Sequence, residues 1–220
     1  MNNPIPQSQK GEYNNLLVLA ISSCICVAFL AARLLLSGTI GMAFMVWNLF
    51  LAWVPWIISW IMTRDNSPKW LFWGLMSLWI LFLPNAPYMI TDLFHLLWRK
   101  GMPMWVDLCL IFSFAWTGML LGFDSLRMVQ RRLKPMLPKW LDVLFAPFLL
   151  FLVAYGVYLG RYLRFNSWDI ATHPLLLAKK VISPIFYPFV HSAAIGFTLM
   201  FGALLTLTYF SFMNMDVRRA

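Results

Sequence analysis

Six long runs of mostly apolar residues dominate this sequence and limit what it can fold into. They cover residues 16–36, 40–62, 70–91, 105–126, 141–163 and 185–212. About 20 predominantly apolar residues are enough for one helix to cross the hydrocarbon core of a bilayer. A membrane barrel would need alternation with a period of two residues, which these runs lack. We therefore predict an all-α, polytopic membrane bundle of about six transmembrane helices.

The composition agrees with a chain that is surrounded mainly by lipid. Hydrophobic residues make up 61% of the 220 residues and charged residues only 11%. The net charge of +9 would suggest nucleic acid in a soluble protein. Here the Lys and Arg residues lie mostly in short linkers, where they set membrane topology, so we expect the lipid bilayer as the partner and no nucleic acid.

The distribution of positive charge predicts the orientation. The N-terminus, the 63–69 and 127–140 linkers and the C-terminus hold ten Lys and Arg residues, whereas the other side holds seven. The excess predicts that both termini are cytoplasmic. We expect a tail over residues 1–15, one transmembrane domain over 16–213 and a second tail over 214–220. The first run lacks a clear cleavage site, so it reads as a retained span rather than a signal peptide.

A first polar stretch, Phe82–Trp98, follows the third apolar run. Asn85, Tyr88, Asp92 and His95 recur there at spacings of three and four residues, which place side chains on one helix face. Pro84 and Pro87 lack backbone N–H groups, so the third span is predicted to be broken or kinked at that point. A break would begin a new half-helix near Asn85, whereas a simple kink would end the span and leave Asp92 and His95 in a loop.

A second polar stretch follows the fifth span. It contains Arg161, Arg164, Asn166 and Asp169, and with Asp107 it would fall on the same side of the membrane as the first stretch.

Intramembrane arginines usually have a partner or a water-filled cavity, so we expect Asp92 or Asp107 beside Arg161 and Asp169 beside Arg164. The alternative is that the two arginines reach lipid phosphates, as Arg33 can at the end of the first span. Paired guanidinium groups could also hold an anionic lipid headgroup.

Metal and cofactor signals are weak. Asp92 and His95 could share a metal with His173 and His191, but two ligands do not make a site. Cys24, Cys26 and Cys109 lie inside apolar runs and read as small hydrophobic residues. We predict no metal site and assign no cofactor. The pairs Gly118/Gly122 and Gly156/Gly160 offer small-residue faces through which a homodimer could pack.

Three sequence blocks resemble a known family. They are WNLFLAWVP (Trp47–Pro55), FLPNAPYMITDLFHL (Phe82–Leu96) and YLGRYLRFNSWD (Tyr158–Asp169). In the same order they are similar to blocks of the bacterial family catalogued as domain of unknown function number 1361. The resemblance implies a multi-span protein of the bacterial cytoplasmic (inner) membrane, with no established activity, substrate or cofactor.

Three functions stay open. The simplest is a structural or assembly component, in which the polar residues only hold the bundle together. The second is a membrane-embedded enzyme acting on a lipid or lipid-linked anionic substrate, with Asp92 or His95 as acid/base and Arg161 and Arg164 holding the anion. No HExxH, GxSxG or Walker motif supports it. The third is a small-solute or ion transporter subunit, which a broken helix with polar residues would suit.

Overall fold

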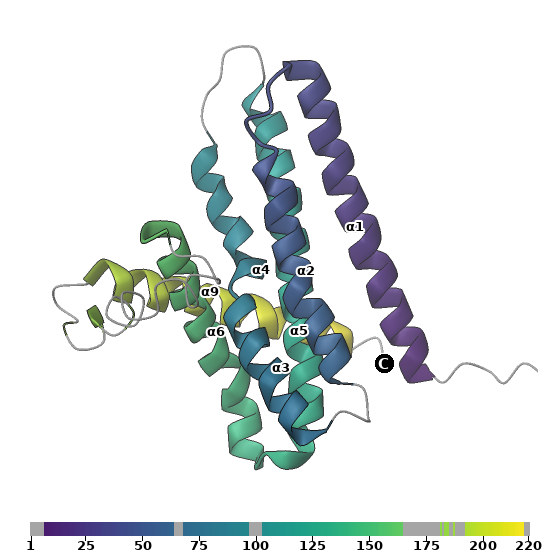
Figure 1. Cartoon of the computed structure of the whole chain (residues 1–220), viewed down its shortest axis with the longest axis vertical. Coiled ribbons are helices and arrows are strands. Elements are labelled where there is room, and N and C mark those ends of the chain that lie inside the picture. The colour runs from purple at the N-terminus through teal and green to yellow at the C-terminus, as the bar shows by residue number, and fades with distance from the viewer. Residues whose placement is uncertain are drawn as a thin grey trace, which may run out of the picture. The chain divides into compact units, whose positions relative to one another are not determined.

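The structure is a computed structural model that describes residues 7–63, 68–96, 103–164, 181, 183–184, 187 and 192–217. Over these residues the chain is helical and contains no strand (Figure 1). The elements are α1 (Gln7–Ser37), α2 (Phe44–Met62), α3 (Lys69–Phe82), α4 (Asn85–Tyr88), the 3₁₀ helix η1 (Met89–His95), α5 (Met104–Leu133), the 3₁₀ helix η2 (Lys134–Met136), α6 (Lys139–Tyr162) and α9 (Ser192–Val217).

Six helical segments are long and apolar enough to cross a membrane. They correspond to the six predicted runs and confirm the all-α membrane bundle. The first segment differs at its start, because α1 begins at Gln7, within the stretch predicted as a polar tail. The surface also fits lipid, since Leu35, Met200 and Leu207 are more than two-thirds exposed. The chain is a multi-pass integral membrane protein.

The third apolar segment is broken where the prolines predict it. Helix α3 ends at Phe82, and the Leu83 N–H closes its last turn on the Trp79 carbonyl at 2.8 Å. The chain then turns through Leu83 and Pro84 before α4 begins. Proline removes a backbone donor and clashes with the preceding turn, which accounts for the break. Helix α4 has four residues and leads directly into η1.

The fold divides into two compact units. Unit 1 comprises residues 1–56 and 85–124, and unit 2 comprises residues 57–84 and 125–220. Helices α2 and α5 therefore each contribute to both units. Unit 1 contains α1, α4 and η1 with the first parts of α2 and α5, whereas unit 2 contains α3, α6 and α9 with the remainder of those two helices.

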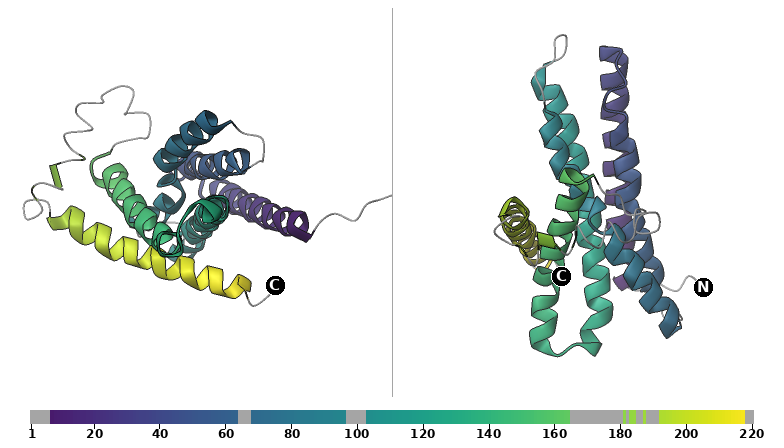
Figure 2. Two further views of the ribbon diagram at one scale, coloured as in Figure 1. Left: turned by 90° about the horizontal axis from the view of Figure 1, so that it is seen from below. Right: turned by 60° about the vertical axis from the view of Figure 1, so that its left-hand side comes forward.

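Unit 2 is organised around the contact of α6 with α9. Figure 2 shows that α9 crosses α6 steeply instead of running alongside it. Gly202 of α9 allows this approach, because a Cβ there would overlap the ring of Phe151. Gln130 of α5 connects the two helices, since its side chain accepts from the Tyr209 hydroxyl and donates to the Asp142 side chain and carbonyl at 2.9–3.1 Å.

Candidate functional site

The break in the third span brings Asp92 into the interior of unit 1. Asp92 lies in η1 and is 1% exposed. The Asn48 side-chain amide, four residues into α2, donates to Asp92 Oδ2 at 2.9 Å. Because a buried carboxylate needs hydrogen-bond donors, this bond ties η1 to α2. It also gives the amide of Asn48, which lies within the second apolar run, the partner on another element that an amide at membrane depth requires.

His95 lies at the end of η1 and faces a different environment. Its ring is exposed and meets the ring of Phe44 edge-on, with the ring centroids 5.3 Å apart. Asp92 of η1 contacts Asn48 of α2, and His95, later in η1, contacts Phe44, earlier in α2. The two elements therefore run antiparallel. A 3₁₀ helix has three residues per turn, which keeps Asp92 and His95 on one side of η1. The pair is therefore split between a buried carboxylate and an exposed imidazole.

Asp107, at the start of α5, forms a buried ion pair with Arg33 of α1. Arg33 Nε lies 3.0 Å from Asp107 Oδ1, and the two side chains are 2% and 3% exposed. Arg33 Nη1 also donates to the Thr39 hydroxyl at 2.9 Å and to the Thr39 carbonyl at 3.2 Å. The expectation that Arg33 extends to lipid headgroups is therefore wrong, because Asp107 and Thr39 satisfy its guanidinium inside unit 1.

This pair also corrects the partner expected for Asp107. The sequence pattern offered Asp107 as a partner of Arg161, but its carboxylate accepts from Arg33. Arg161 and Arg164 lie in unit 2. The predicted grouping of these arginines with Asn85, Tyr88 and Asp92 stays a prediction.

A third buried carboxylate, Asp124, lies at the other end of the contact between α1 and α5. Asp124 is 6% exposed and accepts from the Asn15 amide and from the Trp56 indole N–H, both at 2.9 Å. Between the two ends, Cys26 Sγ and Thr117 Oγ1 lie 3.3 Å apart. Asn15, Trp56 and Thr117 were not among the residues predicted from the sequence.

A sequence signal for this seam does exist. One series of buried residues along α5 recurs at alternating steps of three and four, the spacing of a helix–helix seam. They are Asp107, Leu110, Phe114, Thr117, Leu121 and Asp124. Helix α1 presents a matching series that runs antiparallel to it, in which Leu19, Cys26, Leu30 and Arg33 are buried.

The small-residue face of α5 receives the broken helix. A Cβ on Gly118 would overlap the Ala86 carbonyl oxygen and the end of the Met89 side chain, and one on Gly122 would lie 3.0 Å from Ala86 Cβ. In unit 2, a Cβ on Gly156 would lie 2.6 Å from Pro84 Cγ. Gly118 and Gly122 thus have a close neighbour within the chain itself. A homodimer through these glycine faces stays a prediction.

Several predicted site residues lie outside the described part of the chain. They are Asn166, Asp169, His173 and His191. Among the described residues, no three His, Cys, Asp or Glu side chains group closely enough to hold a metal ion.

With this geometry established, residues 47–208 match the family described as "Protein of unknown function (DUF1361)". The chain belongs to the DUF1361 family. The match includes Asn48, Asp92, Asp107 and Asp124, whereas Asn15 and Arg33 of α1 precede it. Comparison of this DUF1361 protein with curated proteins and with solved structures found no match.

The arrangement in unit 1 of this DUF1361 protein is chemically a set of closed polar contacts. Each of its three buried carboxylates accepts a hydrogen bond from a side chain of a different element. Such contacts hold helices in register. Helix α4 adds no anion site of its own, because four residues are too few to develop a useful helix dipole.

Proposed function

We propose that this protein is a structural or assembly component of its membrane, and that the polar residues of unit 1 fix the register of its helices instead of performing chemistry. The observation that carries the proposal is the burial and closure of Asp92, Asp107 and Asp124, which are 1%, 2% and 6% exposed. Each accepts from a donor on another element of unit 1.

A charged group taken out of water into a low-dielectric interior loses several kcal/mol of solvation, by order-of-magnitude estimates, and only a correctly placed partner offsets that loss. If α1 slid along α5, Asp107 and Asp124 would lose their partners together. The two carboxylates are about 25 Å apart along α5 at the usual helical rise. Contacts at both ends therefore specify one register, as buried polar groups do in coiled coils.

The proposal is tested by the reactivity of native Cys26, which lies inside the α1–α5 seam beside Thr117. In a variant that lacks Cys24 and Cys109, a membrane-impermeant methanethiosulfonate reagent is applied to both sides of the membrane. We expect no labelling of Cys26 until the protein is denatured. Ile40→Cys, placed at an 81% exposed residue between α1 and α2, is the positive control in a cysteine-free background.

Transport is the second candidate, and the broken third span favours it. Transporters often build their sites from broken helices whose polar residues lie at membrane depth, and here such a break carries Asp92 opposite Asn48. A transport path would admit water to this pair. In the same cysteine-free background, Asn48→Cys would then react with the impermeant reagent from one side or from both in turn. Labelling of Cys26 or of Asn48→Cys in the folded protein would contradict the structural proposal.

We also propose the bacterial cytoplasmic membrane as the location, with both termini in the cytoplasm. The location is supported by the resemblance of the three sequence blocks to a family of the bacterial inner membrane, and the orientation by the excess of Lys and Arg residues in the termini, 63–69 and 127–140. Fusion of alkaline phosphatase and of a green fluorescent protein to the C-terminus tests the orientation. We expect fluorescence and no phosphatase activity, and the reverse result would refute the orientation.

A further inference from the structure

An apolar groove of about 350 Å³ lies on unit 2 where α6 meets α9. This volume falls at the lower end of the range of small-molecule sites. The α6 wall includes Phe151, Leu152 and Tyr155, and the α9 wall includes Ile195, Thr198 and Leu199. Leu152 is 42% exposed and Leu199 is 57% exposed, so the groove opens onto the outer surface of this unit.

The polar atoms that line the groove already have partners. The Tyr155 hydroxyl donates to the Val181 carbonyl at 2.6 Å, and the Thr198 hydroxyl donates to the Ala194 carbonyl within α9 at 2.7 Å. A polar ligand would lose its hydrogen bonds to water on entering the groove and could not replace them with bonds to these groups. Binding of such a ligand is therefore unfavourable. An extended hydrocarbon chain suits the groove better, and a membrane supplies such chains on this surface.

Aromatic rings continue from the groove toward the end of α6. Tyr158 and Tyr162 are stacked with their centroids 4.9 Å apart, and both rings contact Phe197 of α9. Tyr162 follows Tyr155 by two helical turns and so lies on the same face of α6. Tyrosine is enriched at the boundary between hydrocarbon and headgroups, so this strip fits the region near the glycerol backbone of a lipid.

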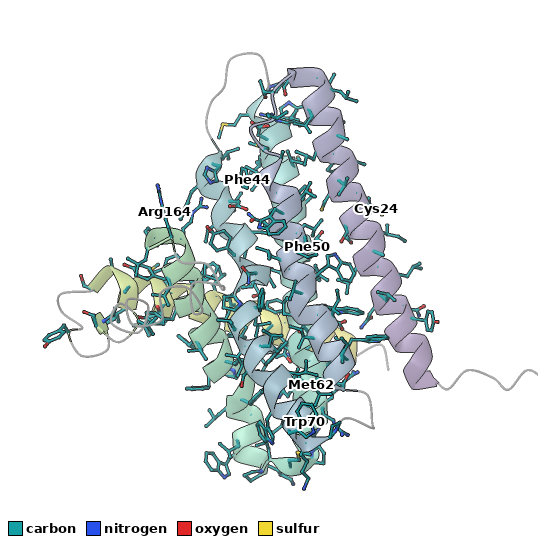
Figure 3. The ribbon with its side chains drawn as sticks, in the orientation of Figure 1. Cys24, Phe44, Phe50, Met62, Trp70 and Arg164 are labelled. Carbon is teal, nitrogen blue, oxygen red and sulfur yellow. The ribbon has the colours of Figure 1, made fainter. Side chains whose placement is uncertain are left out.

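Arg164 terminates the strip. It follows the last turn of α6 with a left-handed backbone (φ 57°), and its side chain is exposed and directed away from the helix (Figure 3). Arg164 lies about 13 Å beyond Tyr155 at the usual helical rise, within the length of a phospholipid. Among the unit 2 side chains described by the structure, Asp142 is the one carboxylate, and it lies in the first turn of α6, at the opposite end.

We propose that unit 2 binds one anionic phospholipid, whose acyl chain fills the α6–α9 groove and whose phosphate contacts Arg164. The apolar lining selects the acyl chain, and the guanidinium matches the phosphate in charge and geometry. It favours an anionic phospholipid over phosphatidylcholine because the choline ammonium of the latter opposes the charge of Arg164. The inference uses unit 2 alone and does not depend on the function proposed from unit 1.

The test is native mass spectrometry of the full-length protein in detergent, with equal amounts of phosphatidylglycerol and phosphatidylcholine that carry the same acyl chains. We expect the wild type to retain one phosphatidylglycerol about fivefold in preference, the order expected of one exposed charge-assisted contact. Arg164→Gln should lower this preference to near unity. Lys139→Gln removes the same charge at the other end of α6 and should leave the preference unchanged.

Filling the groove provides the second arm. Leu152→Trp should reduce retention of both lipids, because the indole occupies the space of the acyl chain. Val143→Trp, at a 62% exposed residue of α6 outside the groove, is the matched control and should retain lipid as the wild type does. Glycerol phosphate without acyl chains should not compete. The proposal is overturned if Arg164→Gln keeps the preference, if Leu152→Trp keeps the lipid, or if glycerol phosphate alone displaces it.

Discussion

Arg33 and Asp107 form a buried ion pair across 74 residues of sequence, with Arg33 Nε 3.0 Å from Asp107 Oδ1. The pair joins the end of α1 to the beginning of α5. Among the contacts described for unit 1, it is the one in which both partners carry a formal charge. Variants of this pair therefore distinguish the free-energy cost of one unpaired buried charge from the stabilisation that the pair itself provides.

Removing one partner should be far more harmful than removing both. Asp107→Leu leaves the buried guanidinium without its carboxylate and should lower the free energy of unfolding by about 3–5 kcal/mol. Arg33→Met with Asp107→Leu leaves no uncompensated charge, and we expect it to lie within about 1 kcal/mol of the wild type or above it. Denaturant unfolding in lipid nanodiscs measures both. Equal destabilisation by the single and double variants would contradict a simple pairing role.

Two tryptophans allow the stability contribution of a hydrogen bond to a charged acceptor to be compared with that of a bond to a neutral acceptor. Trp56 donates to the carboxylate of Asp124 at 2.9 Å, whereas Trp53 donates to the neutral hydroxyl of Ser23 at 3.1 Å. Trp56→Phe should cost about 1.5–3 kcal/mol and Trp53→Phe about 0.5–1.5 kcal/mol through the lost hydrogen bond, in addition to the loss of ring contacts in each. The comparison uses the same unfolding measurement. A larger loss in Trp53→Phe would show that packing, not the acceptor, controls the difference.

The close approach of α5 to the broken helix predicts a steric asymmetry between two glycines. Gly118→Ala places a methyl group against the Ala86 carbonyl oxygen, so we expect a loss of about 1–3 kcal/mol through forced displacement. Gly74→Ala is the control, because a Cβ there meets nothing within 4 Å. It should stabilise α3 by up to about 1 kcal/mol through helix propensity. If Gly118→Ala were as stable as Gly74→Ala, the packing of the break against α5 would be wrong.

In unit 2, Gln130 should matter more than any one of its partners. Tyr209→Phe removes one hydrogen bond to Gln130, whereas Gln130→Leu removes that bond and two more to Asp142. At about 1 kcal/mol for each net bond, Gln130→Leu should lose two to three times as much stability. Thermal unfolding of the two variants in the same detergent gives the ratio. A ratio near one would indicate that the bonds to Asp142 contribute little.

Part of the candidate site followed directly from local sequence. Pro84 and Pro87 predicted a break or a kink because proline lacks an N–H wherever it stands in a chain, and the structure has the break. The position of Asn48 within an apolar run also indicates an interhelical bond, because an amide at membrane depth needs a partner. Neither inference identified Asp92 as that partner, because spacing along one helix carries no information on which other helix faces it.

The pairing error has the same origin. Arg161 was expected beside Asp92 or Asp107, partners chosen by predicted depth in the membrane. The structure gives Asp107 to Arg33 and Asp124 to Asn15 and Trp56. Arg33 and Asn15 become the partners because α1 packs antiparallel against α5. This packing fixes all the contacts between the two helices together.

The sequence by itself determined that this chain is a helical membrane protein, where its third span breaks and which residues are polar at depth. Lipid provides no hydrogen bonds, so the length and composition of each apolar run dictate helix formation locally. The tertiary structure alone decided which polar groups meet and which remain exposed. Asp92, for example, is only 1% exposed, whereas His95 of the same 3₁₀ helix is exposed. Partner choice depends on how several helices pack together, and no single helix encodes the position of its neighbours.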